Sequence, residues 1–163
     1  MRALTLSALA PRPLEHLWDI GGGSGAIAIE WLLAGPDLSA TSIEPRADRA
    51  ATIRANAARL GVDRLEVIEG RAPDALEGLA PPDAVFIGGG LDAGLLDWLR
   101  ARLAPGTRLV ANAVTLETEA LLAAAQARMG GDLMRVALSS AAPLGRYRGW
   151  QPARPITQWS VTL

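Results

Sequence analysis

Leu17-Trp18-Asp19-Ile20-Gly21-Gly22-Gly23-Ser24-Gly25-Ala26-Ile27-Ala28 joins a predicted strand to a predicted helix through a glycine-rich turn. The apolar run ends in the acid Asp19, and the glycines lead directly into an apolar helix. Nineteen residues after Gly25, a second apolar run ends in another acid, Glu44. A parallel sheet presents a nucleotide-like cofactor in this way, at the carboxyl end of its first strand. The stretch therefore predicts a cofactor site.

Around this stretch the chain alternates between strand and helix patterns. After an amphipathic helix at 2–9, which two prolines end, five strand–helix units follow, and two segments with period-two alternation close the chain. This order predicts a three-layer α/β fold with a mostly parallel sheet, a C-terminal antiparallel hairpin and a single domain over residues 1–163. The predicted strands are 14–20, 40–43, 65–69, 84–87 and 108–113; the helices are 25–33, 47–60, a short one ending at 79, 92–103, and one from 115 or 117 to about 130; the hairpin joins 133–139 to 156–163 through a polar loop.

The composition limits the chemistry that the chain can perform. The 163 residues include no cysteine, which excludes disulfides, thiolate metal sites and cysteine nucleophiles. All 16 basic residues are arginine, so no lysine is present to form a Schiff base or act as a general base. The net charge of −1 gives no general attraction to nucleic acid. No apolar run is long enough to span a membrane and no secretory signal is visible, so we expect a cytoplasmic protein.

Two classes of cofactor are compatible with the glycine-rich turn. The pattern Gly21-x-Gly23-x-x-Ala26 satisfies the dinucleotide fingerprint, with Glu44 near the distance expected for a ribose-binding acid. Asp19 and Gly25 extend the pattern to Asp-x-Gly-x-Gly-x-Gly, which resembles the first motif of the class I S-adenosylmethionine-dependent methyltransferases. A hydride-transfer enzyme with a tyrosine–lysine proton relay cannot be built without lysine. The resemblance implies a Rossmann-like methyltransferase sheet with S-adenosylmethionine as the cofactor.

The resemblance also assigns contacts to the cofactor. Backbone N–H groups at the start of the first helix suit its carboxylate, Asp19 its ammonium and Glu44 its ribose. Arg71 stands where this family often has an acid that meets the adenine amino group, so the neighbouring backbone is expected to do so, and a surface role for Arg71 stays open. The predicted cofactor-binding residues are Asp19, Gly21, Gly22, Gly23, Ser24, Gly25, Glu44, Pro45, Arg71, Ala72 and Gly88.

A narrower resemblance comes from the second half of the chain. Residues 86–90 (Phe-Ile-Gly-Gly-Gly), 109–118, 142–145 and 155–159 are similar to the decarboxylating precorrin methyltransferases of cobalamin biosynthesis. This family implies methylation of a precorrin at C15, with decarboxylation of an acetate side chain. It also implies a homotetramer, a second methyltransferase domain that is fused to this one or works with it, and a segment upstream of Arg2 that caps the cofactor.

The predicted substrate residues follow from the chemistry of a large, flat polycarboxylate. Glycines after the fourth strand let a macrocycle approach the backbone, and an asparagine at the end of a central strand can orient it or make a structural hydrogen bond. Arginines in the C-terminal loop, interleaved with Tyr147 and Trp150, suit carboxylates, although a solvated loop is an equal alternative. The predicted substrate residues are Gly89, Gly90, Asn112, Thr115 and Arg146, the last with Arg148 and Arg154 nearby.

No residue is assigned as a catalytic acid or base, and no metal site is predicted. His16, the single histidine, is interpreted as structural, and Met129 and Met134 as packing residues. Methyl transfer to an enamine-like carbon requires orientation more than proton transfer, so this residue set is sufficient. Two alternatives stay open: a methyltransferase that acts on RNA or protein, and a non-catalytic cofactor-binding module.

Overall fold

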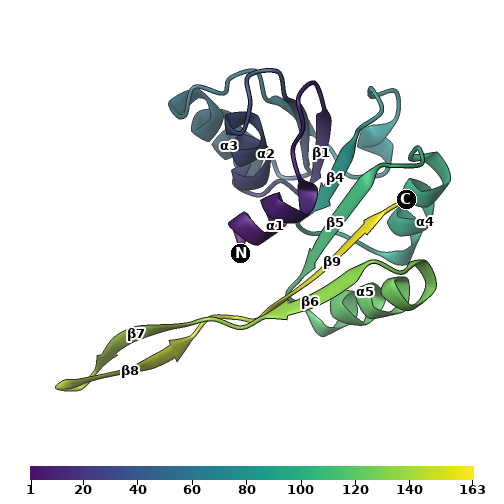
Figure 1. Cartoon of the computed structure of the whole chain (residues 1–163). Coiled ribbons are helices and arrows are strands. Elements are labelled where there is room, and N and C mark those ends of the chain that lie inside the picture. The colour runs from purple at the N-terminus through teal and green to yellow at the C-terminus, as the bar shows by residue number, and fades with distance from the viewer.

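A computed structural model describes all 163 residues, which form a central sheet with helices on both faces and a projecting two-stranded arm (Figure 1). The central sheet has seven strands in the order β3-β2-β1-β4-β5-β9-β6. β1 to β5 are mutually parallel, whereas β9 lies antiparallel between β5 and β6. The strands are β1 (His16–Ile20), β2 (Ser39–Glu44), β3 (Glu66–Glu69), β4 (Ala84–Ile87), β5 (Arg108–Ala113), β6 (Asp132–Val136) and β9 (Ile156–Thr162).

Helices cover both faces of this sheet, as the alternating pattern predicts. On one face lie α1 (Arg2–Leu9), α2 (Ala26–Leu33) and α3 (Ala47–Arg59); on the other lie η1 (Asp74–Leu76), α4 (Ala93–Arg102) and α5 (Leu116–Met129). Because successive side chains of a strand point to opposite faces, Leu17 enters the first core and Trp18 the second. The three-layer prediction is confirmed.

The first helix is held against the sheet by buried polar contacts. Nε of Arg108, on β5, donates to the carbonyl oxygen of Leu9 at the end of α1 over 2.6 Å, and its Nη1 donates to Glu15 over 3.0 Å. Arg108 is 8% exposed, so this ion pair is largely removed from water. It fixes the start of the chain beside the central strands.

The C-terminal segment differs from the prediction. The predicted pairing of β6 with β9 is confirmed, but residues 139–152 do not form a polar loop. They form a second hairpin, β7 (Ser139–Leu144) with β8 (Tyr147–Pro152), which projects from the domain as a two-stranded arm (Figure 1). The segment is rich in glycine and proline, which favour a loop prediction. Its two strands also lack the alternating apolar pattern of a sheet face that packs against a core. None of the helices has the length and apolar character needed to cross a membrane.

Candidate cofactor-binding site

A cleft of about 290 Å³ lies at the carboxyl ends of β1, β2, β3 and β4. Four predicted groups of residues meet there: the glycine-rich turn after β1, the end of β2, the loop after β3 and the glycines after β4. The lining residues are Ile20, Gly21, Gly23, Ile43, Glu44, Pro45, Arg49, Gly70, Arg71, Ala72, Gly88, Gly89 and Gly90.

The glycine-rich turn is held by backbone hydrogen bonds and by left-handed backbone conformations. The N–H groups of Gly21 and Gly22 donate to the carbonyl oxygen of Ile43 over 2.9 and 3.2 Å, and Gly25 N–H donates to Gly22 over 2.8 Å. Gly21, Gly23 and Gly25 have φ values of 72°, 61° and 77°, which other residues adopt at a cost. A glycine pattern is therefore needed to lead β1 into α2 with the backbone open to the cleft.

Glu44 occupies the end of β2 as a buried carboxylate with two backbone partners. It is 2% exposed; Oε2 accepts the N–H of Gly23 over 2.9 Å, and Oε1 accepts the N–H of Arg46 over 3.1 Å. These bonds tie the glycine-rich turn to the neighbouring strand end and fix the orientation of the carboxylate. Each oxygen keeps further lone-pair capacity, so the group can also accept two hydroxyl hydrogens from a diol.

Asp19 lies beneath the glycine-rich turn and does not line the cleft. It is 1% exposed, and Ser42 Oγ donates to its Oδ2 over 3.4 Å while Oδ1 has no partner. Burial raises the pKa of Asp19 to about 7, against the opposing effects of the Ala28 N–H and of Ser42. Asp19 therefore supports the turn from below, and neither of its carboxylate oxygens lines the cleft.

Three other predicted cofactor residues also lie outside the cleft lining. A Cβ on Gly22 would lie 2.1 Å from Ser42 Oγ, so this glycine packs inward against β2. Gly25 caps α2, and the carbonyl oxygen of Ser24 accepts a hydrogen bond from Asn56 over 3.0 Å. These residues shape the turn, whereas Gly21 and Gly23 face the cleft.

The loop of Gly88, Gly89 and Gly90 closes the other side of the same cleft. Gly88 N–H donates to Ile20 over 2.9 Å, and a Cβ on Gly21 would lie 2.7 Å from the carbonyl oxygen of Gly89. The two glycine loops therefore touch backbone to backbone. Gly89 and Gly90, predicted for the substrate, line the same cleft as Gly88, predicted for the cofactor.

Two arginines contribute unpaired charge to the end of the cleft opposite the glycine loops. Arg71, a predicted residue, and Arg49, which sequence analysis missed, both line the cleft and form no ion pair or side-chain hydrogen bond. Arg49 lies in the first turn of α3, and no sequence motif marks it as a site residue.

The other predicted substrate residues lie elsewhere. Asn112 Nδ2 donates to Thr5 Oγ1 over 3.1 Å, and Thr5 donates to Gln158 Oε1 over 3.0 Å, while Asn112 Oδ1 is buried without a partner. Thr115 caps α5 by accepting the N–H of Thr118 over 3.3 Å. Arg146 lies in the turn between β7 and β8, at the tip of the arm. Asn112 follows Ala111, which is the register partner of Ile87 at the end of β4.

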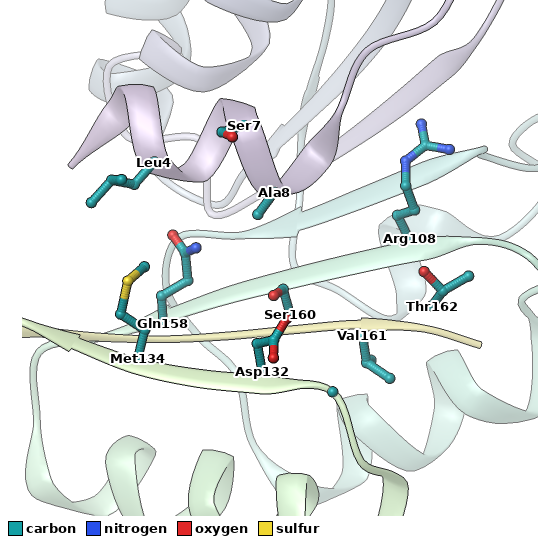
Figure 2. Close-up of a pocket in the computed structure, with 11 residues that line it drawn as sticks. Leu4, Ser7, Ala8, Arg108, Asp132, Met134, Gln158, Ser160, Val161 and Thr162 are labelled. Atoms are coloured by element: carbon teal, nitrogen blue, oxygen red, sulfur yellow. The ribbon is translucent and has the colours of Figure 1, made fainter.

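A larger cleft, of about 630 Å³, lies between α1 and the open faces of β9 and β6 (Figure 2). Its floor carries Gln158 and Ser160 beside Met134 and Asp132, and Leu4 of α1 overhangs it. None of the predicted cofactor or substrate residues lines it. Met134 is 37% exposed there, which corrects its interpretation as a packing residue, whereas Met129 packs against the second core.

The single histidine is engaged on both ring nitrogens. Nδ1 of His16 lies 2.8 Å from Ser39 Oγ, and Nε2 lies 3.2 Å from Thr41 Oγ1. Burial lowers the pKa of His16, so the neutral form predominates at neutral pH. His16 is the first residue of β1, so it lies at the amino end of a central strand, away from the cleft at the carboxyl ends, which agrees with its structural interpretation.

Comparison with known proteins agrees with this geometry over the whole chain. The family model of the precorrin methyltransferase domain matches residues 1–163. A precorrin-6Y C(5,15)-methyltransferase [decarboxylating] from Sinorhizobium sp is 55% identical over 163 residues, which cover 99% of this chain and 40% of that protein. The cobalt-precorrin-6B C(15)-methyltransferase (decarboxylating) of Salmonella typhimurium is 35% identical, over 96% of this chain and 83% of the relative.

A solved structure shows the same fold. The C-terminal domain of precorrin-6Y C5,15-methyltransferase from Rhodobacter capsulatus superposes with a TM-score of 0.96 at 55% identity, covering 100% of this chain and 88% of that one. The chain spans about two fifths of the length of the precorrin-6Y relatives that it matches. With the family model matching from end to end, the chain belongs to the precorrin methyltransferase domain family.

Proposed function

We propose that this domain is an S-adenosylmethionine-dependent C-methyltransferase that methylates C15 of a precorrin and decarboxylates one of its acetate side chains in cobalamin biosynthesis. The observation that carries the proposal is the pairing of Glu44 with the glycine-rich turn. A buried carboxylate with its two oxygens fixed by Gly23 and Arg46 stands ready for a ribose diol, in a chain of the precorrin methyltransferase domain family.

The residues of the cleft fit this cofactor from one end to the other. The start of α2, where the first N–H groups have no intrahelical partner, suits the carboxylate of its methionine moiety, and Glu44 suits its ribose. When bound, the cofactor supplies an electrophilic methyl group on a sulfonium. The chain's own part is to hold that methyl group beside the glycines after β4 and to exclude water there.

The substrate side of the cleft is formed by backbone. No atom lies within 4 Å of a Cβ built on Gly89 or Gly90, so a large flat ring can approach them closely. A carbon of an enamine-like ring attacks the methyl group without a protein base, and the ring accepts the electron pair released as an acetate carboxylate leaves as CO₂. Orientation is the protein's main contribution, and it can reach effective molarities of about 10⁵ M.

The family resemblance also leads to proposals about the oligomeric state, a second domain and the cellular location. We propose a homotetramer, supported by an arm that exposes Leu144, Tyr147 and Trp150 with 68%, 74% and 77% of their surface open to solvent. A two-stranded ribbon has little stability alone, which favours its burial between copies. The length of the precorrin-6Y relatives favours a second methyltransferase domain beside this one. The absence of cysteine suits a cytoplasmic setting.

A turnover assay with two readouts tests the function. The domain is incubated with S-adenosylmethionine and a precorrin that carries the acetate side chain, and S-adenosylhomocysteine and CO₂ are both measured. The proposal expects both products in equal amounts, and none when Glu44→Ala replaces the wild type. Methyl transfer to RNA or protein, with none to the precorrin, would contradict it.

A further inference from the structure

The end of the cleft beyond Glu44 offers two unpaired guanidinium groups and no free carboxylate. Arg46 and Arg54, on the same side of the domain, are paired with Asp48 and Glu69 over 2.8 Å each. Arg49 and Arg71, in contrast, line the cleft without any such partner, and both are exposed to solvent. Their charges are therefore available to a ligand.

The order of the strands places the base of the cofactor at these arginines. This inference rests on the proposed function, which puts the methionine moiety at the turn after β1 and the ribose at Glu44, the end of β2. β3 is the next strand of the sheet, about 4.8 Å further on. The adenine then lies over the loop of Gly70, Arg71 and Ala72, with Arg49 of α3 above it.

Adenine offers this end of the cleft a donor and several acceptors. Its 6-amino group donates hydrogen bonds, its ring nitrogens accept them, and its faces attract cations. Arginine only donates, so neither guanidinium can accept a bond from the amino group. Glu44 is the single acid in the lining; each of its oxygens accepts one backbone N–H, and its remaining lone pairs are assigned to the ribose hydroxyls in the proposed function. No lining side chain at this end can therefore serve the amino group.

The backbone of this region is partly occupied as well. The carbonyl oxygen of Arg71 accepts the N–H of Ala75 over 3.0 Å, and that of Glu44 accepts the N–H of Gly70 over 3.2 Å. Among the side chains at this end of the cleft, the two guanidinium groups, with their N–H donors and planar faces, are the groups left to meet the base. A planar guanidinium stacks well on an aromatic ring.

We infer that Arg49 and Arg71 recognise the base of the cofactor through its ring nitrogens and its face, and that the site does not select for the 6-amino group. The binding site should then accept a cofactor analogue in which hypoxanthine replaces adenine. In that base an oxygen acceptor stands where the amino donor was, and a guanidinium can donate to it.

Calorimetric titration of the wild-type protein with S-adenosylhomocysteine and with S-inosylhomocysteine tests this inference. The expected dissociation constants agree within about threefold. Binding of the inosine analogue more than tenfold weaker would show that the amino group is recognised, for example by a backbone carbonyl, and would overturn the inference. Failure of both ligands to bind would instead overturn the proposed function, and the inference with it.

Single substitutions test whether Arg49 and Arg71 contribute to the affinity for both ligands. Arg71→Ala and Arg49→Ala should each weaken both ligands by the same factor, about three- to thirtyfold. Arg71→Glu supplies an acceptor, so it should bind S-adenosylhomocysteine at least tenfold better than the inosine analogue. Unchanged affinity in both alanine variants would overturn the inference. Arg128→Ala, which removes an unpaired surface arginine of α5, is the matched control and should change neither constant; thermal unfolding verifies that each variant is folded.

Discussion

At the scale of single residues, Asp19 illustrates what a motif can and cannot predict. The sequence places an acid at the end of β1, but the direction of its side chain follows from strand alternation. Leu17 and Asp19 point toward the layer of α2, whereas Trp18 and Ile20 point to the other face. Asp19 therefore lies under the turn, hydrogen-bonded to Ser42, and Glu44 is the acid that reaches the cleft.

Asp19 makes the stability of the domain depend on pH. Its pKa is raised from 3.8 to about 7 in the folded state, so the native protein keeps a proton that the unfolded chain has lost between these two values. The free energy of unfolding should fall as pH rises through this window, by ~1–4 kcal/mol. Asp19→Asn should remove that slope and unfold at a higher temperature than the wild type at pH 8, with little difference at pH 4. Thermal unfolding from pH 4 to pH 8 measures this difference in unfolding temperature. Parallel pH profiles for the two proteins would contradict the role given to Asp19.

At the scale of elements, the two glycine loops differ in why they need glycine. Gly21→Ala places a Cβ 2.7 Å from the Gly89 carbonyl oxygen at a φ of 72°, so it should destabilise the domain by ~2–4 kcal/mol. Gly89→Ala meets no atom within 4 Å and should leave the free energy of unfolding within ~1 kcal/mol of wild type. Urea denaturation compares the two. Equal losses of stability would show that the close approach of the loops is not what requires glycine.

The first helix depends on a buried polar chain for its place beside β5 and β9. Thr5 accepts from Asn112 and donates to Gln158, and its side chain is fully buried. Thr5→Val keeps the shape but leaves both partners unpaired, which should cost about 1–3 kcal/mol in the free energy of unfolding. Thr5→Ser, which retains the hydroxyl, should recover most of that loss. A valine variant as stable as the wild type would contradict this stabilising role of the Thr5 hydroxyl.

Most elements could be predicted because hydrophobic period and turn residues agree with the fold. The five strand–helix units, the positions of the breaks and the pairing of β6 with β9 were all predictable in this way. The arm was not, because β7 and β8 pack against nothing and their mixed composition carries no alternating pattern. Arg49 was missed for a different reason, since it belongs to the site through the packing of α3 and not through a motif.

At the scale of the whole molecule, charge is divided between the arm and the rest of the domain. Residues 137–155 contain three arginines and no acid, so with a total net charge of −1 the other residues carry −4. An arm that is positive and apolar, projecting from an acidic domain, is suited to contact other copies of the chain.

Removing the arm should separate assembly from cofactor binding. Val136 and Ile156 are register partners, so an Asn-Gly turn can replace residues 137–155 and close β6 and β9 as a tight hairpin. Light scattering after size-exclusion chromatography should report a tetramer for the wild type and a monomer for this variant. Affinity for S-adenosylhomocysteine should stay the same, because the arm does not line the cleft. A shortened chain that is still tetrameric would contradict the role given to the arm.

We propose that the cleft at the carboxyl ends of β1 to β4 binds the methyl donor. Calorimetric titration with S-adenosylhomocysteine, with NAD run in parallel, tests it most directly. We expect one bound S-adenosylhomocysteine per chain, no binding of NAD, and at least tenfold weaker binding of S-adenosylhomocysteine in Glu44→Gln, which loses the charge that receives the ribose. Binding of NAD alone, or S-adenosylhomocysteine binding that Glu44→Gln leaves unchanged, would contradict it.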